Sequence, residues 1–316
     1  MKKVFYIDGG AGRVIAAIPA LLKYDRLNPN TDWNIVIPGW DSLYWSIPEL
    51  QDRTYSFDTK GLYENILLKA DSVITPEPYK NPDYYKQKIS LAEAFDREIN
   101  QTTDHSDLTP PILIFNKYET NTSLVTLKDV KNKQKKSKTI IIQPFGRGAK
   151  PIEKNQQEQI TKVDDEESRS LTSESYLYLV KKLALKFNVI FFGEPSFQLA
   201  QDTYTEKFNT DLRQWASLID NVDYFVGVDS VGQHMARASG IPGTIIFGST
   251  FPVNTSYPDY FQIIEKPGVK KYSPIRMANF DCVLANRLNE KCMDFTNEEL
   301  DNIFKLICDD IDKNVK

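Results

Sequence analysis

The chain has 316 residues, 41% of them hydrophobic and 26% charged, and its formal net charge at pH 7 is −4. This length predicts two domains with cores of their own, and the acidic balance argues against a dedicated nucleic-acid-binding protein, which would normally be basic. No apolar run approaches the roughly 18 residues of a membrane-spanning helix and no secretory segment precedes Asp8, so we expect a cytoplasmic protein with reduced thiols.

The first part of the chain alternates short apolar runs with helical patterns. Val4–Ile7 is a β-prone run, and three glycines lead from it into a helical pattern over Val14–Tyr24. This order is typical of a Rossmann-like unit. A helix is also expected at Ile89–Ile99, and further strands at Trp33–Ile37, Ser72–Thr75 and Ile112–Phe115. Strands that alternate with helices predict a parallel sheet, here in an α/β domain over residues 1–135.

A lysine-rich run at residues 131–138 contains no apolar side chain and predicts a solvated linker. The second α/β domain is expected over residues 136–316. Its predicted strands are Thr139–Ile142, Val189–Phe192, Tyr224–Val228 and Thr244–Phe247. Its predicted helices are Ser173–Phe187, Gly232–Ser239 and Asn297–Ile311, of which the last closes the domain.

The turn after the first strand could bind a ligand. Gly10 and Gly12 let the backbone approach a phosphate closely, and the helix that follows offers free N–H groups. The dinucleotide fingerprint needs a further glycine at position 15, where the chain has Ile15, so a plain NAD(P) site fits poorly. The alternative is a tight turn without a ligand.

A second candidate is the segment Gln143–Lys150, which follows a predicted strand. Arg147 and Lys150 are well placed there for phosphate oxygens. The alternative is a solvated basic loop.

The third candidate, Asp229–Pro242, follows the apolar strand Tyr224–Val228. Asp229 or Ser230 can cap the helix, and Gly232 allows N–H groups to approach a diphosphate. His234 lies in the first turn of the same helix, where it is either a ligand contact or a structural side chain. The next strand ends in another loop of small residues, so two consecutive strands should deliver loops to the same sheet edge.

These segments, in this order, resemble glycosyltransferase family nine, the ADP-heptose:lipopolysaccharide heptosyltransferases. The strongest match is Asp229–Pro242, with the pattern Asp-Ser, Gly, His-x-Ala-x-Ala-x-Gly-x-Pro. The weaker matches span most of the chain, at Gly9–Val14, Ile18–Leu21, Ile140–Lys150, Phe191–Glu194, Phe247–Pro252 and Cys292–Met293.

The resemblance implies a GT-B fold, with two Rossmann-like domains facing across a cleft, and an inverting transfer that needs no metal or cofactor. The donor, a nucleotide-diphosphate sugar, would bind the second domain. Arg147 and Lys150 would contact phosphate, and Glu194 the ribose or base. Asp229, Ser230, Val231, Gly232, Gln233 and His234 would hold the diphosphate. The acceptor would be a glycan or lipid-linked glycan, such as a lipopolysaccharide core, with peripheral surface contact left open.

One position departs from the family. Heptosyltransferases place an aspartate, a candidate general base, where this chain has Arg13, and arginine cannot accept a proton at neutral pH. The nearest carboxylate is Asp8. Either Asp8 is the base, or Arg13 binds an anionic acceptor or a donor phosphate and another group is the base.

Two other functions remain open at this point. One is sugar transfer to a modified base of phage DNA, for which the lysine-rich run would suit backbone contact and the aromatic residues would suit stacking, namely Trp40, Tyr44, Trp45, Tyr84 and Tyr85. The other is a nucleotide-sugar-binding protein that has lost its base and does not catalyse transfer.

Overall fold

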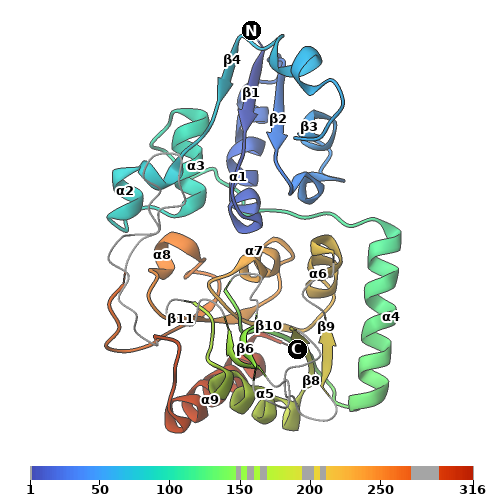
Figure 1. The fold of residues 1–316 in the computed structure, drawn as a ribbon, viewed down its shortest axis with the longest axis vertical. Helices are drawn as coiled ribbons and strands as arrows, with labels where there is room; N and C mark the ends of the chain where they lie inside the picture. The colour runs from blue at the N-terminus through green and yellow to red at the C-terminus, as the bar shows by residue number, and fades with distance from the viewer. Residues whose placement is uncertain are drawn as a thin grey trace. The chain divides into compact units, whose positions relative to one another are not determined.

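The computed structural model describes residues 2–146, 151–154, 160–163, 169–193, 203–206, 211–271 and 292–315. The chain divides into two compact units, one with the described residues up to Asn116 and the other beginning at Lys117. Each unit has a parallel sheet with helices packed on it, so both are α/β as expected (Figure 1).

The boundary between the units lies before helix α4 (Lys117–Gln134), whereas the sequence placed it after residue 135. Helix α4 belongs with the second unit because it packs on α6 (Leu212–Ile219). The expected linker is wrong for residues 131–134, which form the last turn of α4. The helix is stable there because Leu127 and Val130 are buried on its inner side.

The first unit has a four-stranded parallel sheet in the order β3-β2-β1-β4. Its strands are β1 (Lys3–Tyr6), β2 (Trp33–Ile37), β3 (Thr54–Ser56) and β4 (Ser72–Ile74). Its α-helices are α1 (Ala11–Leu27), α2 (Pro82–Tyr85) and α3 (Leu91–Asn100), with short helical turns at Asp41–Tyr44, Gln51–Arg53, Tyr63–Leu67 and Pro78–Lys80. The predicted strand at Ile112–Phe115 is wrong, because these residues join no sheet in the described part of the chain.

The core of the first unit holds α1 against the sheet. Phe5 of β1, Tyr24 of α1 and Trp33 of β2 pack edge to face, with ring centroids 4.8 to 5.8 Å apart. Helices α1 and α3 are also joined by a buried ion pair, in which Lys23 Nζ lies 3.0 Å from Asp96 Oδ2. These contacts hold the C-terminal half of α1 against the sheet and α3.

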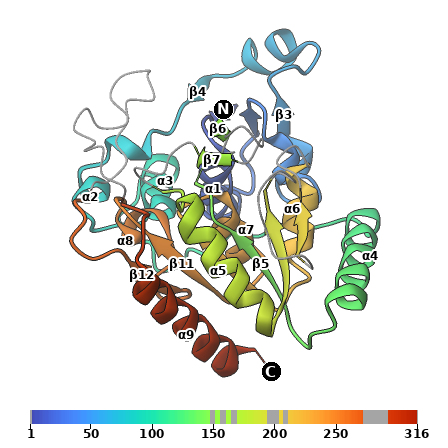
Figure 2. The same cartoon turned by 60° about the horizontal axis from the view of Figure 1, so that its bottom comes forward.

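The second unit has a six-stranded parallel sheet in the order β12-β11-β10-β5-β8-β9. Its strands are β5 (Thr139–Gln143), β8 (Asn188–Phe192), β9 (Tyr204–Glu206), β10 (Tyr224–Val228), β11 (Gly243–Phe247) and β12 (Gln262–Glu265), and β6 (Pro151–Lys154) pairs separately with β7 (Ile160–Val163). Helices α5 (Ser173–Lys186) and α9 (Asn297–Asn314) lie side by side on one face, and α6 and α7 (Val231–Ala238) on the other (Figures 1 and 2). A short helix, α8 (Pro252–Thr255), follows β11. The predicted strands and helices of this unit are confirmed to within a few residues.

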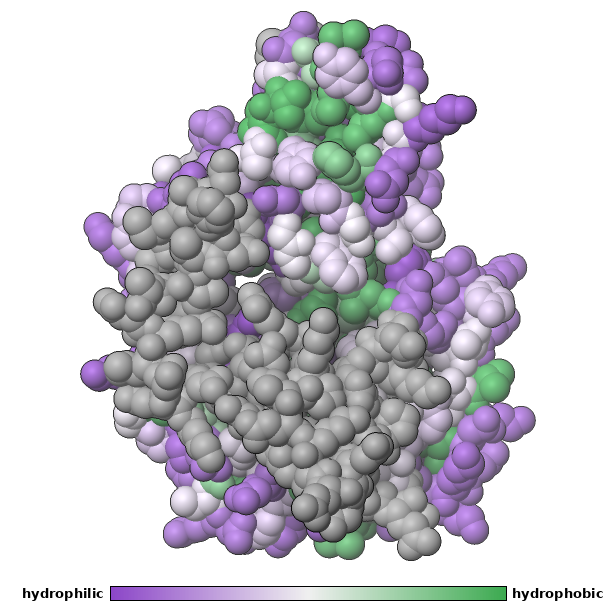
Figure 3. All heavy atoms as spheres, viewed as in Figure 1, coloured by the Kyte–Doolittle hydropathy of each residue, from purple (hydrophilic) through white to green (hydrophobic). Residues whose placement is uncertain are grey.

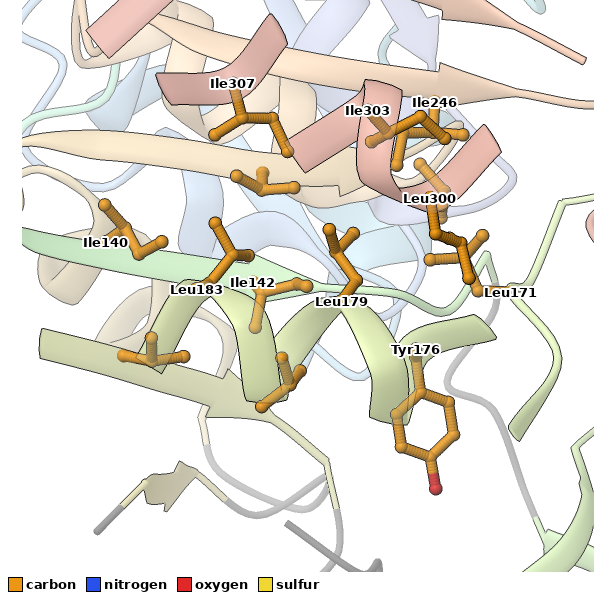
Figure 4. Packing of buried hydrophobic residues seen from close by; sticks show 14 of the residues in the cluster. Ile140, Ile142, Leu171, Tyr176, Leu179, Leu183, Ile246, Leu300, Ile303 and Ile307 are labelled. Atoms are coloured by element: carbon orange, nitrogen blue, oxygen red, sulfur yellow. The ribbon is translucent and has the colours of Figure 1, made fainter. Parts of the chain in front are cut away.

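The core of the second unit lies between its sheet and the helix pair α5 and α9. Side chains of α5 and α9 interleave with those of β5 and β11, among them Leu179, Leu183, Ile303, Ile307, Ile140 and Ile246 (Figure 4). Each such buried aliphatic side chain contributes about 1.5–3 kcal/mol relative to exposure. Helix α9 therefore closes the unit, and a capping box of Thr296 and Glu299 fixes where it starts.

Candidate nucleotide-sugar site

The candidate donor segments follow strands at the centre of the second sheet. From β5 the chain proceeds to β8 and β9 on one side, and then returns to β10, β11 and β12 on the other. The strand order therefore reverses between β5 and β10, and ligands of open α/β sheets bind outside the carboxyl ends of the strands at such a point. The loops after β5 and β10 are the predicted segments Gln143–Lys150 and Asp229–Pro242.

Asp229 joins the loops that follow β10 and β11. Its Oδ2 accepts a hydrogen bond from Thr250 Oγ at 2.8 Å, and its Oδ1 accepts one from Gln233 Nε2 at 3.1 Å. All three side chains are buried, and Gln233 Nε2 also donates to the carbonyl of Thr255 at 3.0 Å. The prediction that two consecutive strands deliver loops to one edge is confirmed. The side chains of Asp229 and Gln233 therefore hold the loops of the site together through their hydrogen bonds.

The first turn of α7 is packed closely against the end of β5. A Cβ on Gly232 would lie 1.9 Å from Oε1 of Gln143 and 2.7 Å from Cζ of Phe225, so any other residue would force these two side chains to move. Ser230, at the N-cap, makes no side-chain capping bond to the helix, and Val231 is the first helical residue. Ser230 Oγ and Gln143 Oε1 are buried without a hydrogen-bond partner among the residues that the structure describes. Buried polar atoms are normally satisfied, so these two point to a polar ligand at this helix start.

His234 lies inside the unit beneath this turn. Its Nδ1 is 2.8 Å from the hydroxyl of Tyr257, and the two rings pack edge to face with centroids 5.5 Å apart. Burial lowers the pKa of His234 to about 4, so the imidazole is neutral at pH 7. It can therefore orient a ligand or the helix, but it adds no positive charge for a leaving diphosphate.

We expect this histidine to make the protein less stable in acid. The folded pKa of about 4 lies below the ordinary value of 6.5, so the unfolded chain binds the proton first as the pH falls. Stability should be unaffected above pH 6.5 and should decline between pH 6.5 and 4, by about 3 kcal/mol in all. Urea unfolding at several pH values measures this. His234→Gln, which can still bond to Tyr257, should remove that part of the slope, and an unchanged slope would contradict the assignment.

Three predicted donor contacts, Arg147, Lys150 and Glu194, lie outside the described residues. The strands that lead to them are described. After β5, the N–H of Gly146 donates to the buried Ser170 Oγ at 2.9 Å, which fixes the start of that loop. Strand β8, which leads to Glu194, pairs with β5 in parallel.

The remaining predicted residues, Asp8, Gly10, Gly12 and Arg13, lie in the first unit. Gly10 is the N-cap of α1, and Gly12 and Arg13 are in its first turn. The first sheet also reverses its strand order, between β1 and β4, so this turn lies at the reversal of that sheet. Glycine is required by backbone conformation at Gly9, whose φ is +94°, rather than at Gly10, where an added Cβ would meet no atom within 4 Å.

The Arg13 side chain contacts residues that follow β1 and β4. One guanidinium nitrogen, Nη2, lies 3.1 Å from Asp8 Oδ1 and donates to the carbonyl of Pro76 at 2.7 Å. The other, Nη1, lies 3.5 Å from Glu77 Oε1. The Arg13 side chain is 2% exposed, whereas that of Asp8 is 29% exposed. This geometry favours a structural role for Arg13 over binding of an anionic ligand, and it leaves Asp8 as the accessible carboxylate.

The sequence reasoning missed Glu77 and Tyr257. Glu77 follows the predicted strand Ser72–Thr75, so its place at a strand's carboxyl end was a usable signal. Its partner Arg13 lies 64 residues earlier, a separation that no local pattern bridges. Tyr257 is 23 residues from His234, with which it forms its hydrogen bond.

Comparison with known proteins agrees with a donor site at the segment that follows β10. The family model for glycosyltransferase family 9 (heptosyltransferase) matches residues 208–269, which include β10, α7 and β11. A search of curated proteins finds no match.

Solved structures with the same fold cover most of the chain at low sequence identity. A glycosyl transferase family 9 protein from Veillonella parvula covers 84% of this chain and 87% of its own, with a TM-score of 0.63 and 13% identity. The ADP-heptose lps heptosyltransferase II of E. coli covers 97% and 99%, with a TM-score of 0.61 and 14% identity. E. coli heptosyltransferase WaaC, solved with ADP, covers 99% of both chains, with a TM-score of 0.57 and 14% identity. The predicted GT-B fold class is confirmed.

Proposed function

We propose that this chain is a family 9 glycosyltransferase, whose family model residues 208–269 match, and that it moves a sugar from a nucleotide-diphosphate donor to a hydroxyl of a bacterial surface glycan, such as a lipopolysaccharide core. The observation that carries this proposal is the start of α7. There an added Cβ on Gly232 would clash with the side chains of Gln143 and Phe225, and two buried polar atoms have no hydrogen-bond partner among the described residues; all lie at the strand reversal of the sheet.

The second unit binds the donor in this proposal. Backbone N–H groups of Val231, Gly232 and Gln233 open helix α7, and such a helix start attracts phosphate through its free donors and its partial positive charge. Asp229 and Thr250 hold the flanking loops in place. Arg147 and Lys150 are proposed as phosphate contacts and Glu194 as the ribose or base contact, from their places in the family pattern.

The first unit supplies the base that removes the proton of the acceptor hydroxyl. We assign this role to Asp8, which follows β1, is partly exposed and is oriented by Arg13. Attack by the acceptor oxygen at the anomeric carbon, opposite the departing diphosphate, inverts the configuration of that carbon. The charge on the leaving group is met by the α7 start and the proposed cations, so the reaction is proposed to need no metal.

The acceptor favoured here is a glycan. A modified DNA base, which the lysine-rich run left open, has no support from the comparisons. The E. coli protein of similar fold is named an ADP-heptose lps heptosyltransferase II, and that name is the basis for the glycan class.

A panel of nucleotide sugars tests the proposal in two steps. The true donor, at about 100 times its dissociation constant, should stabilise the protein by roughly 2.7 kcal/mol, visible as a thermal shift. With that donor and a lipopolysaccharide-core acceptor, product should form equally well with and without EDTA. Binding without turnover would favour a non-catalytic nucleotide-sugar-binding protein. Loss of activity on chelation, restored by Mg²⁺ or Mn²⁺, would overturn metal independence.

A further inference from the structure

Helix α4 presents an unusual outer face. Tyr118, Leu124 and Val125 are 78%, 49% and 62% exposed, which is high for apolar side chains in a helix that packs on a core. In the space-filling view, hydrophobic atoms over α4 are surrounded by hydrophilic ones (Figure 3). The inner face of the helix carries the buried Ser123, Leu127 and Val130 instead, so the outer apolar residues are not needed for its packing.

Lysines continue this outer face toward the end of the helix. Leu124, Lys128 and Lys131 are spaced by four and three residues, which places them along one stripe of α4, and Lys135 directly follows the last helical residue. Lys133 and Lys136 are also exposed. None of these five lysines forms an ion pair with a carboxylate among the residues that the structure describes. A chain with a net charge of −4 thus carries a concentrated positive surface at one place.

The orientation of α4 is fixed by polar contacts on its inner side. Arg213 of α6 binds Glu119 through two nitrogens, at 2.5 and 2.8 Å. Ser123 Oγ donates to Ser217 Oγ at 2.9 Å, and the side chain of Gln134 exchanges two hydrogen bonds with the backbone of Val189 in β8. Because both ends of the helix are held, its apolar and lysine-bearing face is a permanent surface of the second unit.

We infer that the outer face of α4, defined by Tyr118, Leu124, Val125, Lys128 and Lys131 together with Lys135 just after the helix, docks on an anionic lipid bilayer. Lysines near a bilayer are attracted by anionic headgroups, while exposed aliphatic and aromatic side chains gain from entering the interface. Nucleic acid would use the lysines but would gain nothing from Leu124 and Val125. No helix in the described part of the chain is long and apolar enough to cross a bilayer, so the contact is peripheral.

Vesicle cosedimentation tests this inference directly. The full-length protein should bind mixed phosphatidylglycerol and phosphatidylcholine vesicles and leave pure phosphatidylcholine vesicles unbound. The triple variant Lys128→Gln, Lys131→Gln, Lys135→Gln should lose roughly 100-fold in partitioning, because each lysine near the surface contributes roughly fivefold. Leu124→Ser with Val125→Ser should reduce partitioning as well, and this reduction should persist at high salt, where charge is screened.

Matched variants on other helices serve as controls. Lys181→Gln, Lys305→Gln and Lys313→Gln remove the same charge from exposed positions of α5 and α9, and Leu185→Ser removes an exposed leucine of α5. The triple lysine control and the Leu185→Ser control should each bind vesicles as the wild type does. Equal loss in the control variants, or binding to phosphatidylcholine alone, would overturn the inference. Binding to duplex DNA without binding to vesicles would assign the surface to nucleic acid instead. Sugar transfer enters none of these measurements, so they stand apart from the proposed reaction.

Discussion

Replacing Arg13 with methionine is expected to lower the free energy of unfolding by about 3 kcal/mol. The change leaves the carboxylates of Asp8 and Glu77 without the cation that lies 3.1 and 3.5 Å from them. Removing one member of a buried ion pair costs about 3–5 kcal/mol, and the lower end applies because both carboxylates keep some contact with water. Guanidinium or urea unfolding measures the difference.

Arg26→Met is the matched control for this prediction. Arg26 lies in the last turn of the same helix, and its side chain is 46% exposed and 3.6 Å from Asp107. Its loss should change stability by less than about 1 kcal/mol. Adding Asp8→Asn and Glu77→Gln to Arg13→Met should restore most of the lost stability, because no unpaired charge then remains. If Arg13→Met alone is as stable as the wild type, Arg13 is free to serve a ligand and its structural role is refuted.

Asp8→Asn should reduce the turnover number for sugar transfer by about 10²- to 10⁴-fold, the usual contribution of a general base. The amide has the shape of the carboxylate but cannot accept the acceptor's proton. Because the donor is proposed to bind the second unit, its dissociation constant should stay the same. Steady-state kinetics with saturating donor, together with isothermal titration of the donor, separates these two effects.

Glu77→Gln is the comparison that decides which carboxylate acts. It removes the other negative partner of Arg13 while keeping Asp8 intact. Turnover should remain within about tenfold of the wild type, well short of the loss of a general base. If Glu77→Gln abolishes turnover and Asp8→Asn does not, the base is Glu77, and the assignment of Asp8 fails.

The fold was predictable where apolar runs are buried on both faces of a sheet. Strands β2 and β10 were predicted at their observed limits because all five residues of each are buried. The run Ile112–Phe115 is equally apolar, but strand formation also requires a neighbour to pair with, which a local pattern does not contain. Helix α4 was missed for the opposite reason. It is largely polar, and it is held by hydrogen bonds to α6 and β8 from distant parts of the chain.

The candidate site also has features that the sequence predicted and features that it did not. The α7 segment was predictable because one contiguous stretch contains the strand, the turn, the glycine and the helix start. The reason for glycine at position 232 was not predictable. It depends on Gln143, which lies 89 positions earlier on β5 and contacts α7 only in the folded sheet. The neutral state of His234 likewise follows from burial, which no motif encodes.

The ion-paired group around Arg13 also limits how this sequence can change. A single exchange of Arg13 for aspartate would bring a third carboxylate beside those of Asp8 and Glu77, with no cation between them. A charge reversal at 13 is therefore tolerable only together with neutral residues at 8 and 77. The charges at positions 8, 13 and 77 are therefore coupled, and a charge change at one of them is expected to require changes at the others.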